Sequence, residues 1–298
     1  AILLFTASDL ANAEQKIEGD EPPHADEALL PLLADFESGS TEERIAAAMA
    51  IRELGIVAWP AMPALIDALA DPIIGVRRSA AGALGGIGPS AAAAVPALTQ
   101  RLADPHRFVR SWAAMALYEI GGAAKPATDA LIHLMRTDTE NLRGRSWAAS
   151  ALPEIGADSS VVIPALVTTL AEDDSREVRA VVILSLQRYG KQGVRSPAIT
   201  SSLFAALSDD EPLIRANASC ALADLASELE VGRSAIALAL RDEASIARGC
   251  AARAMGEMGR PALEWRDEVQ KLTEDPEAHV RYEAERAIER LRELSGRE

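Results

Sequence analysis

The hydrophobic positions of this chain repeat every 33 to 36 residues, and an arginine marks the same place in each repeat. Small residues stand at the third and sixth positions after the arginine, and mostly aliphatic residues stand at the seventh and tenth. These four positions share one face of a helix, so each repeat is predicted to contain an amphipathic helix. The eight marker arginines are Arg44, Arg77, Arg110, Arg145, Arg179, Arg215, Arg248 and Arg281.

Glycine is predicted to end most of these helices. Six of the eight repeats carry a glycine eleven positions after the arginine, where the left-handed C-cap conformation favours this residue. These residues are Gly55, Gly88, Gly121, Gly156, Gly190 and Gly259. In the sixth repeat Ala226 takes the place of the glycine, so a different bend is expected at that joint.

A second helix is predicted before each marker arginine. Its signature is Pro-Ala-Leu with a further Leu four positions on, as in residues 63–69, 96–102 and 164–170. Proline suits the first turn of a helix, because its missing N–H has no intrahelical partner there. An aspartate, in three repeats followed directly by proline, is predicted to end this helix in a short turn.

One such helix pair cannot bury its own apolar face, but a stack of identical pairs can. The predicted fold is therefore all-α: a right-handed α-solenoid, or superhelix, of about eight stacked helix pairs over residues 27–298. Each fully buried Leu or Ile is expected to contribute about 1.5–3 kcal/mol to this stack.

The segment 104–121 reads Asp-Pro-x-x-x-Val-Arg-x-x-Ala-Ala-x-Ala-Leu-x-x-Ile-Gly, which resembles the HEAT-like repeat of the phycobilisome-lyase type. The resemblance covers about eight units, roughly residues 27–294. It implies the fold but no single activity, because the same repeat carries many unrelated functions. The members that give the family its name imply one enzymatic alternative, a chromophore lyase or isomerase acting on bilin-bearing proteins.

Residues 1–26 are predicted to form a separate N-terminal segment that ends in an acidic linker. Residues 1–7 are an apolar run, and Ala11-Asn12-Ala13 fits an Ala-x-Ala cleavage site, so the segment is either a signal remnant or a capping helix. A cytoplasmic location is expected in the second case, and a periplasmic or secreted one in the first. The run is too short to span a bilayer, and no other segment is expected to be long enough and apolar throughout.

The charge balance narrows the possible partners. The chain has 298 residues with 30 Lys and Arg against 45 Asp and Glu, a net charge of −15. Extended binding to nucleic acid or to an anionic membrane needs basic surface, so both partners are disfavoured. Two cysteines, Cys220 and Cys250, exclude a disulfide framework and a four-cysteine zinc site, and they are predicted to be small, buried, inert thiols.

No motif for catalysis or for a metal or cofactor emerges. The four histidines, His24, His106, His133 and His279, have no helical spacing to one another, and none is followed by the Glu that HEAT-repeat di-iron hydroxylases carry. No phosphate-binding glycine loop precedes a helix in the expected context. The chain is expected to be non-enzymatic, without a cofactor.

The marker arginines and the aspartates of the preceding turns form the most regular charged feature. This column either binds an acidic partner or ties neighbouring turns together, and the structural role is favoured because each Asp can cap a helix and each Arg can bridge two turns. The residues predicted for this structural ladder are Asp71, Arg77, Asp104, Arg110, Asp173, Arg179, Asp209 and Arg215.

The second helices are expected to line the concave side of the solenoid. Their outward-facing positions in the first five repeats are unusually apolar and small, with aromatic and methionine side chains of the kind used in helix or peptide recognition. The candidate binding residues are Trp112, Met115, Tyr118, Trp147, Met49, Arg78, Leu184 and Arg188. The alternative, that Trp112 and Trp147 pack between repeats, stays open. The sequence thus predicts a scaffold, favoured as a monomer, for a protein or peptide partner.

Overall fold

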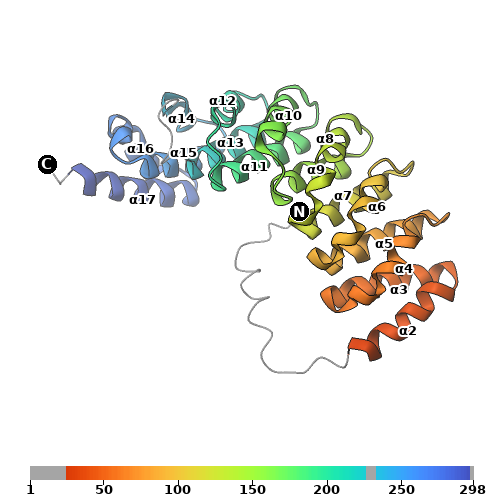
Figure 1. The fold of residues 1–298 in the computed structure, drawn as a ribbon. Helices are drawn as coiled ribbons and strands as arrows, with labels where there is room; N and C mark the ends of the chain where they lie inside the picture. Colours follow the sequence, from red (N-terminus) through yellow and green to blue (C-terminus); the bar gives the residue numbers. More distant parts are fainter. Residues whose placement is uncertain (1–24, 226–232, 296–298) are drawn as a thin grey trace.

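The computed structural model describes residues 25–225 and 233–295, and within these ranges it contains helices and no strand. The helices form eight antiparallel pairs stacked side by side in an open arc (Figure 1). The predicted signal remnant, most of the acidic linker, His24 and Ala226 lie outside the described residues.

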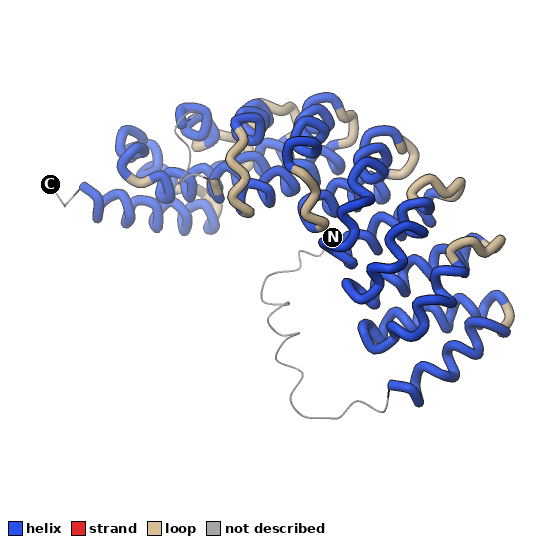
Figure 2. Tube along the Cα trace, in the orientation of Figure 1, coloured by secondary structure: helices blue, strands red, loops and turns tan. Residues whose placement is uncertain are grey.

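The even-numbered helices form the outer layer of the arc, and Figure 2 shows the helices of both layers with the loops between them. They are α2 (Ala25–Ser38), α4 (Met62–Ala68), α6 (Val95–Arg101), α8 (Thr128–Thr137), α10 (Ser159–Glu172), α12 (Pro197–Ala206), α14 (Arg233–Ala239) and α16 (Arg266–Lys271). Short 3-10 segments join several pairs: η1 (Gly55–Ala61), η2 (Gly88–Ala94), η3 (Gly121–Ala127), η5 (Arg260–Trp265) and η6 (Leu272–Glu274).

The odd-numbered helices, each of which carries a marker arginine, form the inner layer. They are α3 (Thr41–Leu54), α5 (Ile74–Ile87), α7 (Arg107–Ile120), α9 (Leu142–Glu154), α11 (Arg176–Lys191), α13 (Pro212–Asp224), α15 (Ser245–Met258) and α17 (Ala278–Ser295). This two-layer arrangement is the α-solenoid that the repeat predicts.

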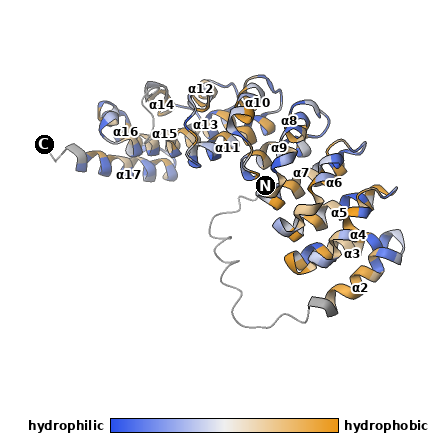
Figure 3. Ribbon diagram, viewed as in Figure 1, coloured by the Kyte–Doolittle hydropathy of each residue, from blue (hydrophilic) through white to orange (hydrophobic). Residues whose placement is uncertain are grey.

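One continuous hydrophobic core runs through the stack from Leu29 to Leu291. Apolar residues follow the interior of both layers (Figure 3). The small residues three positions after the marker arginines are all buried, which lets neighbouring inner helices pack closely: Ala47, Ala80, Ala113, Ala148, Val182, Ala218, Ala251 and Ala284. The core has no single centre, because each pair buries its apolar face against the pairs on either side.

Five of the six predicted glycines have a positive φ at the ends of inner helices, between 62° and 70°. At Gly55, Gly88, Gly121 and Gly259, however, ψ lies between −142° and −130°, so these helix ends do not have the left-handed C-cap conformation that was predicted, although they still need glycine. The prediction for Gly190 was wrong. Helix α11 continues through Gly190 to Lys191, and Gly193 has the positive φ instead. Gly190 serves packing, because a Cβ there would lie 2.7 Å from Cδ2 of Leu225 on the next unit.

Proline lies in the first turn of the second and third outer helices, as predicted, but not in the first turn of the fifth. Pro63 and Pro96 lie in the first turns of α4 and α6. Helix α10 begins earlier, at Ser159, because the side chain of Asp158 accepts a hydrogen bond from the Ser160 N–H at 2.9 Å. Pro164 therefore lies inside that helix, which corrects the prediction of a first-turn position.

Two helical stretches, Thr41–Ala68 and Ile74–Arg101, are long and apolar enough to cross a membrane, with mean hydropathies of 1.4 and 1.3. The expectation that no such segment exists was therefore too broad. In the structure each stretch comprises an inner helix, a glycine with positive φ, a 3-10 segment and the next outer helix.

Gly86 in α5 lies directly against the backbone of α3. A Cβ at this position would lie 2.6 Å from the carbonyl oxygen of Arg52 and 3.1 Å from its Cα. Overpacking of this kind costs about 1–3 kcal/mol, more than the helix propensity that alanine adds. Gly86→Ala is expected to lower the free energy of unfolding by about 1–2 kcal/mol in chemical denaturation.

Gly249→Ala is the matched control. Its nearest neighbour would be Cδ2 of His279 at 3.4 Å, an ordinary contact. Since helix propensity favours alanine by about 1 kcal/mol, this variant is expected to be as stable as the parent chain or more stable. Equal losses in the two variants would contradict the close approach of α3 and α5.

Candidate functional site

The marker arginines link each helix pair to the next through the turns at one edge of the stack. Arg77 donates from Nε and one Nη to the two carboxylate oxygens of Asp104, at 2.9 and 3.1 Å. Its other Nη donates to the carbonyl oxygen of Asp71 at 2.8 Å. Comparable ion pairs to the following unit join Arg44–Asp71, Arg110–Asp138, Arg145–Asp173, Arg179–Asp209, Arg215–Asp242 and Arg248–Asp275.

The aspartates of this arginine–aspartate ladder also hold the turn in which they lie. Asp104 accepts a hydrogen bond from the His106 N–H at 2.9 Å, and its side chain is only 1% exposed. Asp71, Asp173, Asp209, Asp242 and Asp275 accept in the same way from the residue two positions on. The ladder atoms thus bind one another, which is the arrangement expected of a structural element rather than a ligand site.

The ladder makes stability depend on pH in the acid range. Burial raises the pKa of Asp104, but hydrogen bonds from Arg77 and from the His106 N–H outweigh it and hold that pKa below its usual value. The hydrogen bond from Arg248 likewise lowers the pKa of Asp275.

A lowered folded-state pKa stabilises the fold above the ordinary Asp value of about 4, and this stabilisation is lost as the pH falls through the folded-state value. The melting temperature is therefore expected to be flat from about pH 7 to pH 5 and to fall steeply below about pH 4. Calorimetry across this range tests the expectation, and equal melting temperatures at pH 7 and pH 3 would contradict it.

The predicted aromatic residues lie on the inner layer, where they pack between units and remain partly exposed. The Trp112 ring lies over Gly82 of the preceding inner helix, where a Cβ would be 2.7 Å from its Cζ3. The rings of Tyr118 and Trp147 are 5.4 Å apart and tilted by 57°. Met115 is only 8% exposed and belongs to the core. Both roles considered for the tryptophans are therefore compatible with their positions.

The remaining predicted residues divide between two parts of the inner face. Met49 on α3 is 58% exposed, and it lines one small cavity together with Arg78 and Trp112. Leu184 and Arg188 lie further along, on α11, where Leu184 is 51% exposed and Arg188 forms an ion pair with Glu154.

A contact between units that are not neighbours was missed by the sequence analysis. Arg52 of α3 reaches across α5 to Glu119 of α7, with 3.5 Å between Nη and Oε1, and its guanidinium lies 4.9 Å from the Trp112 ring centroid. The glycines of α5 leave the room for this contact. Burial raises the pKa of Glu119, and its Oε2 has no hydrogen-bond partner.

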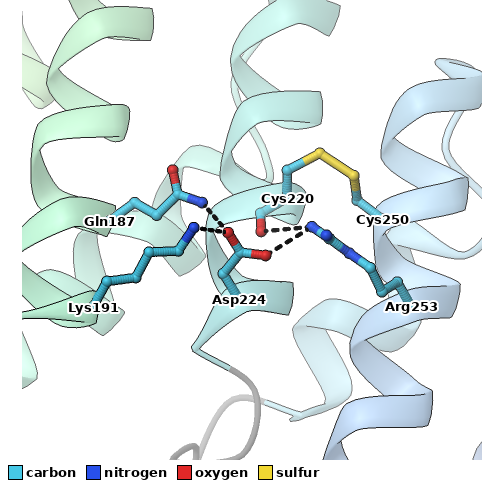
Figure 4. Close-up of a disulfide and its surroundings, with 6 residues drawn as sticks. All are labelled: Gln187, Lys191, Cys220, Asp224, Cys250 and Arg253. Atoms are coloured by element: carbon cyan, nitrogen blue, oxygen red, sulfur yellow. Dashed lines mark hydrogen bonds and ion pairs between the residues drawn. A yellow bond between two sulfur atoms is a disulfide. The ribbon is translucent and has the colours of Figure 1, made fainter. Parts of the chain in front are cut away.

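A polar cluster lies on the inner helices of the C-terminal half. The carboxylate of Asp224 on α13 accepts a hydrogen bond from the side-chain amide of Gln187 and forms an ion pair with Lys191, both on α11 and both at 2.5 Å. It forms a second ion pair with Arg253 of α15 at 2.9 Å (Figure 4). A cavity of about 270 Å³ lies beside this cluster. The charged groups of this cluster are largely paired with one another.

Cys220 and Cys250 form a disulfide between α13 and α15, with their Cα atoms 4.8 Å apart (Figure 4). The prediction of buried free thiols was wrong on both points, since the pair is bonded and each residue is partly exposed. The two residues occupy the fifth and second positions after their marker arginines. On neighbouring inner helices these positions lie side by side, a relation that the number of cysteines alone did not reveal.

Among residues 25–225 and 233–295, no group of three or more His, Cys, Asp or Glu side chains is arranged to hold a metal ion.

Comparison with known proteins agrees with the geometry. A family model described as HEAT repeats matches residues 27–118 and 62–153. Residues 27–153 thus match the HEAT-repeat family, and helix pairs of the same kind continue beyond the matched residues to α17. No curated protein matches the sequence.

Several solved structures share the fold. The Escherichia coli protein YibA is 16% identical over 97% of this chain and 98% of its own, with a TM-score of 0.59. The complex of CpcE and CpcF of phycocyanin lyase from Nostoc sp. PCC7120 is 21% identical over 94% of this chain and 97% of that chain, with a TM-score of 0.50. A structure from work on the interaction between cadherin and beta-catenin is 15% identical, covers 96% of this chain and 65% of that chain, and has a TM-score of 0.50. Two of these neighbours thus come from studies of protein complexes or interactions.

Proposed function

We propose that this protein is a non-enzymatic scaffold that holds a protein or peptide segment against the inner face of α3 to α11. The observation that carries the proposal is the exposure of Met49 and Leu184 on this face, with the partly exposed Trp112, Tyr118 and Trp147 on the helices between them. Aromatic and methionine side chains on a curved surface are the usual means of segment recognition. Two structural neighbours from studies of protein complexes or interactions support a partner of this kind.

The test compares an inner-face variant with an outer-face variant. Met49→Glu with Leu184→Glu places charge on the inner face. Val161→Glu with Leu238→Glu does the same on α10 and α14, where these side chains are 49% and 74% exposed. Proteins captured from the source cell by the parent chain are purified, and their dissociation constants are measured against all three chains.

The inner-face variant is expected to lose binding, and the outer-face variant is expected to keep it. Equal affinity of all three chains for every purified partner would overturn the inner-face site. The bilin-handling alternative predicts a change in the absorption spectrum when free bilin is mixed with the chain, and such a change would count against a purely binding role.

A further inference from the structure

The inner face of the first three units holds a small, partly enclosed cavity. Its volume is about 80 Å³, and it is lined by Met49, Arg52, Glu53, Arg78, Ser79, Gly82 and Trp112. A cavity of about 150 Å³ accepts a benzene ring, so this one has room for a single small aliphatic side chain. We refer to it as the Arg78 cavity.

Apolar groups form one part of its wall. Trp112 covers the surface that Gly82 leaves open, and the exposed Met49 stands beside it. Methionine adapts its shape to a ligand at small cost, because its side chain is unbranched and polarisable. An aliphatic group entering the cavity would therefore contact Met49 and Trp112.

The two arginines of the cavity differ in their surroundings. Arg52 is held by the Trp112 ring and by Glu119. Arg78 is half-buried, yet within the described ranges it makes no hydrogen bond, ion pair or ring contact. The eight marker arginines, by contrast, all donate to aspartates or turn carbonyls. Arg78 is thus a partly desolvated cation whose hydrogen-bonding capacity is unused.

We infer that the Arg78 cavity recognises a partner segment in which one acidic side chain stands next to a small aliphatic one, an inference that rests on the proposed function. The carboxylate pairs with Arg78 through charge-assisted hydrogen bonds, and the aliphatic group fills the space beside Met49 and Trp112. Glu53 also lines the cavity and the chain carries a net charge of −15, so a long acidic run would be repelled and the segment has a single acidic residue, placed at Arg78.

The test uses a random heptapeptide library displayed on phage and selected against the full chain. Peptides enriched on the parent chain are expected to contain one Asp or Glu beside Val, Leu, Ile or Met. The same peptides, made synthetically, are expected to bind Arg78→Gln about tenfold more weakly or worse, as for the loss of a charge-assisted hydrogen bond.

Three comparisons make the result specific. Changing the peptide's acidic residue to its amide is expected to produce the same loss on the parent chain and little further loss on Arg78→Gln. The control Arg143→Gln removes an exposed arginine of α9 outside the cavity and is expected to leave affinity unchanged. Neither substitution removes a contact of the fold, so circular dichroism is expected to be unaltered.

The outcomes distinguish failure of the acidic-segment assignment from failure of the proposed scaffold function. Peptides that bind without an acidic residue, or that bind Arg78→Gln as well as the parent, overturn the acidic-segment assignment. The proposed function survives that result if the same peptides lose affinity for the Met49→Glu, Leu184→Glu variant. A library that yields no peptide sensitive to either variant overturns both.

Discussion

Arg110→Ala is expected to lower the free energy of unfolding by about 2–4 kcal/mol, somewhat less than the loss of a fully buried ion pair. Arg110 donates to both carboxylate oxygens of Asp138, at 2.6 and 2.8 Å, and to the carbonyl oxygen of Asp104 at 2.8 Å. The side chains of Arg110 and Asp138 are only 17% and 11% exposed. Alanine would leave the Asp138 carboxylate with Asn141 as its remaining side-chain partner.

The matched control is Arg107→Ala on the same helix, where the arginine is exposed and contacts the Phe108 ring. Its effect is expected to be below about 0.5 kcal/mol, as for most surface substitutions. Chemical denaturation of both variants gives the comparison. An unchanged melting temperature in Arg110→Ala would falsify the structural role of the ladder, and a selective loss of partner binding at unchanged stability would assign it to recognition instead.

Replacing both cysteines, Cys220→Ser with Cys250→Ser, is expected to destabilise the seventh unit by about 3–4 kcal/mol, the chain-entropy value for a loop of this length. The disulfide spans a sequence separation of 30 and encloses α14, an outer helix of seven residues. A helix of two turns has little stability of its own, so its position depends on the helices around it. Hydrogen exchange over α14 and α15 and calorimetry both report the loss.

Reduction provides the control for this experiment. Dithiothreitol is expected to lower the melting temperature of the parent chain and to leave that of the double serine variant unchanged. Titration of the native, air-oxidised protein with a thiol reagent is expected to find no free thiol. Two reactive thiols in that protein would show that the bond does not form.

The periodicity of the chain was enough to predict the helix pairs and their stacking. A residue such as Ala80 or Leu84 has the same surroundings as its counterparts 33 residues away, because every unit meets an almost identical neighbour. The same reasoning located the arginines and aspartates of the ladder, since the turns recur in the same register. The repeat pattern gave the wrong result where packing against the next unit decided the residue. Gly190 was predicted to end a helix, but it is a glycine because it packs against Leu225.

The candidate site was predictable only in part. The sequence placed Met49, Arg78 and Trp112 on the inner layer, but it did not show that they share one cavity. That depends on Gly82, Gly85 and Gly86, which leave α5 without side chains at the point where Arg52 reaches Glu119. The disulfide was missed for a related reason, because its two residues occupy different positions in their repeats.

By itself, the sequence determined the type, number and order of the helices and the existence of one shared core, because these follow from the interactions of each unit with its immediate neighbours. Only the tertiary structure decided which side chains meet when they lie in units that are not neighbours, as Arg52 and Glu119 do, or at different positions of their repeats, as the two cysteines do. Such contacts depend on the distance between helix axes and on the volume of the residues between them, and neither quantity is written in a repeat pattern.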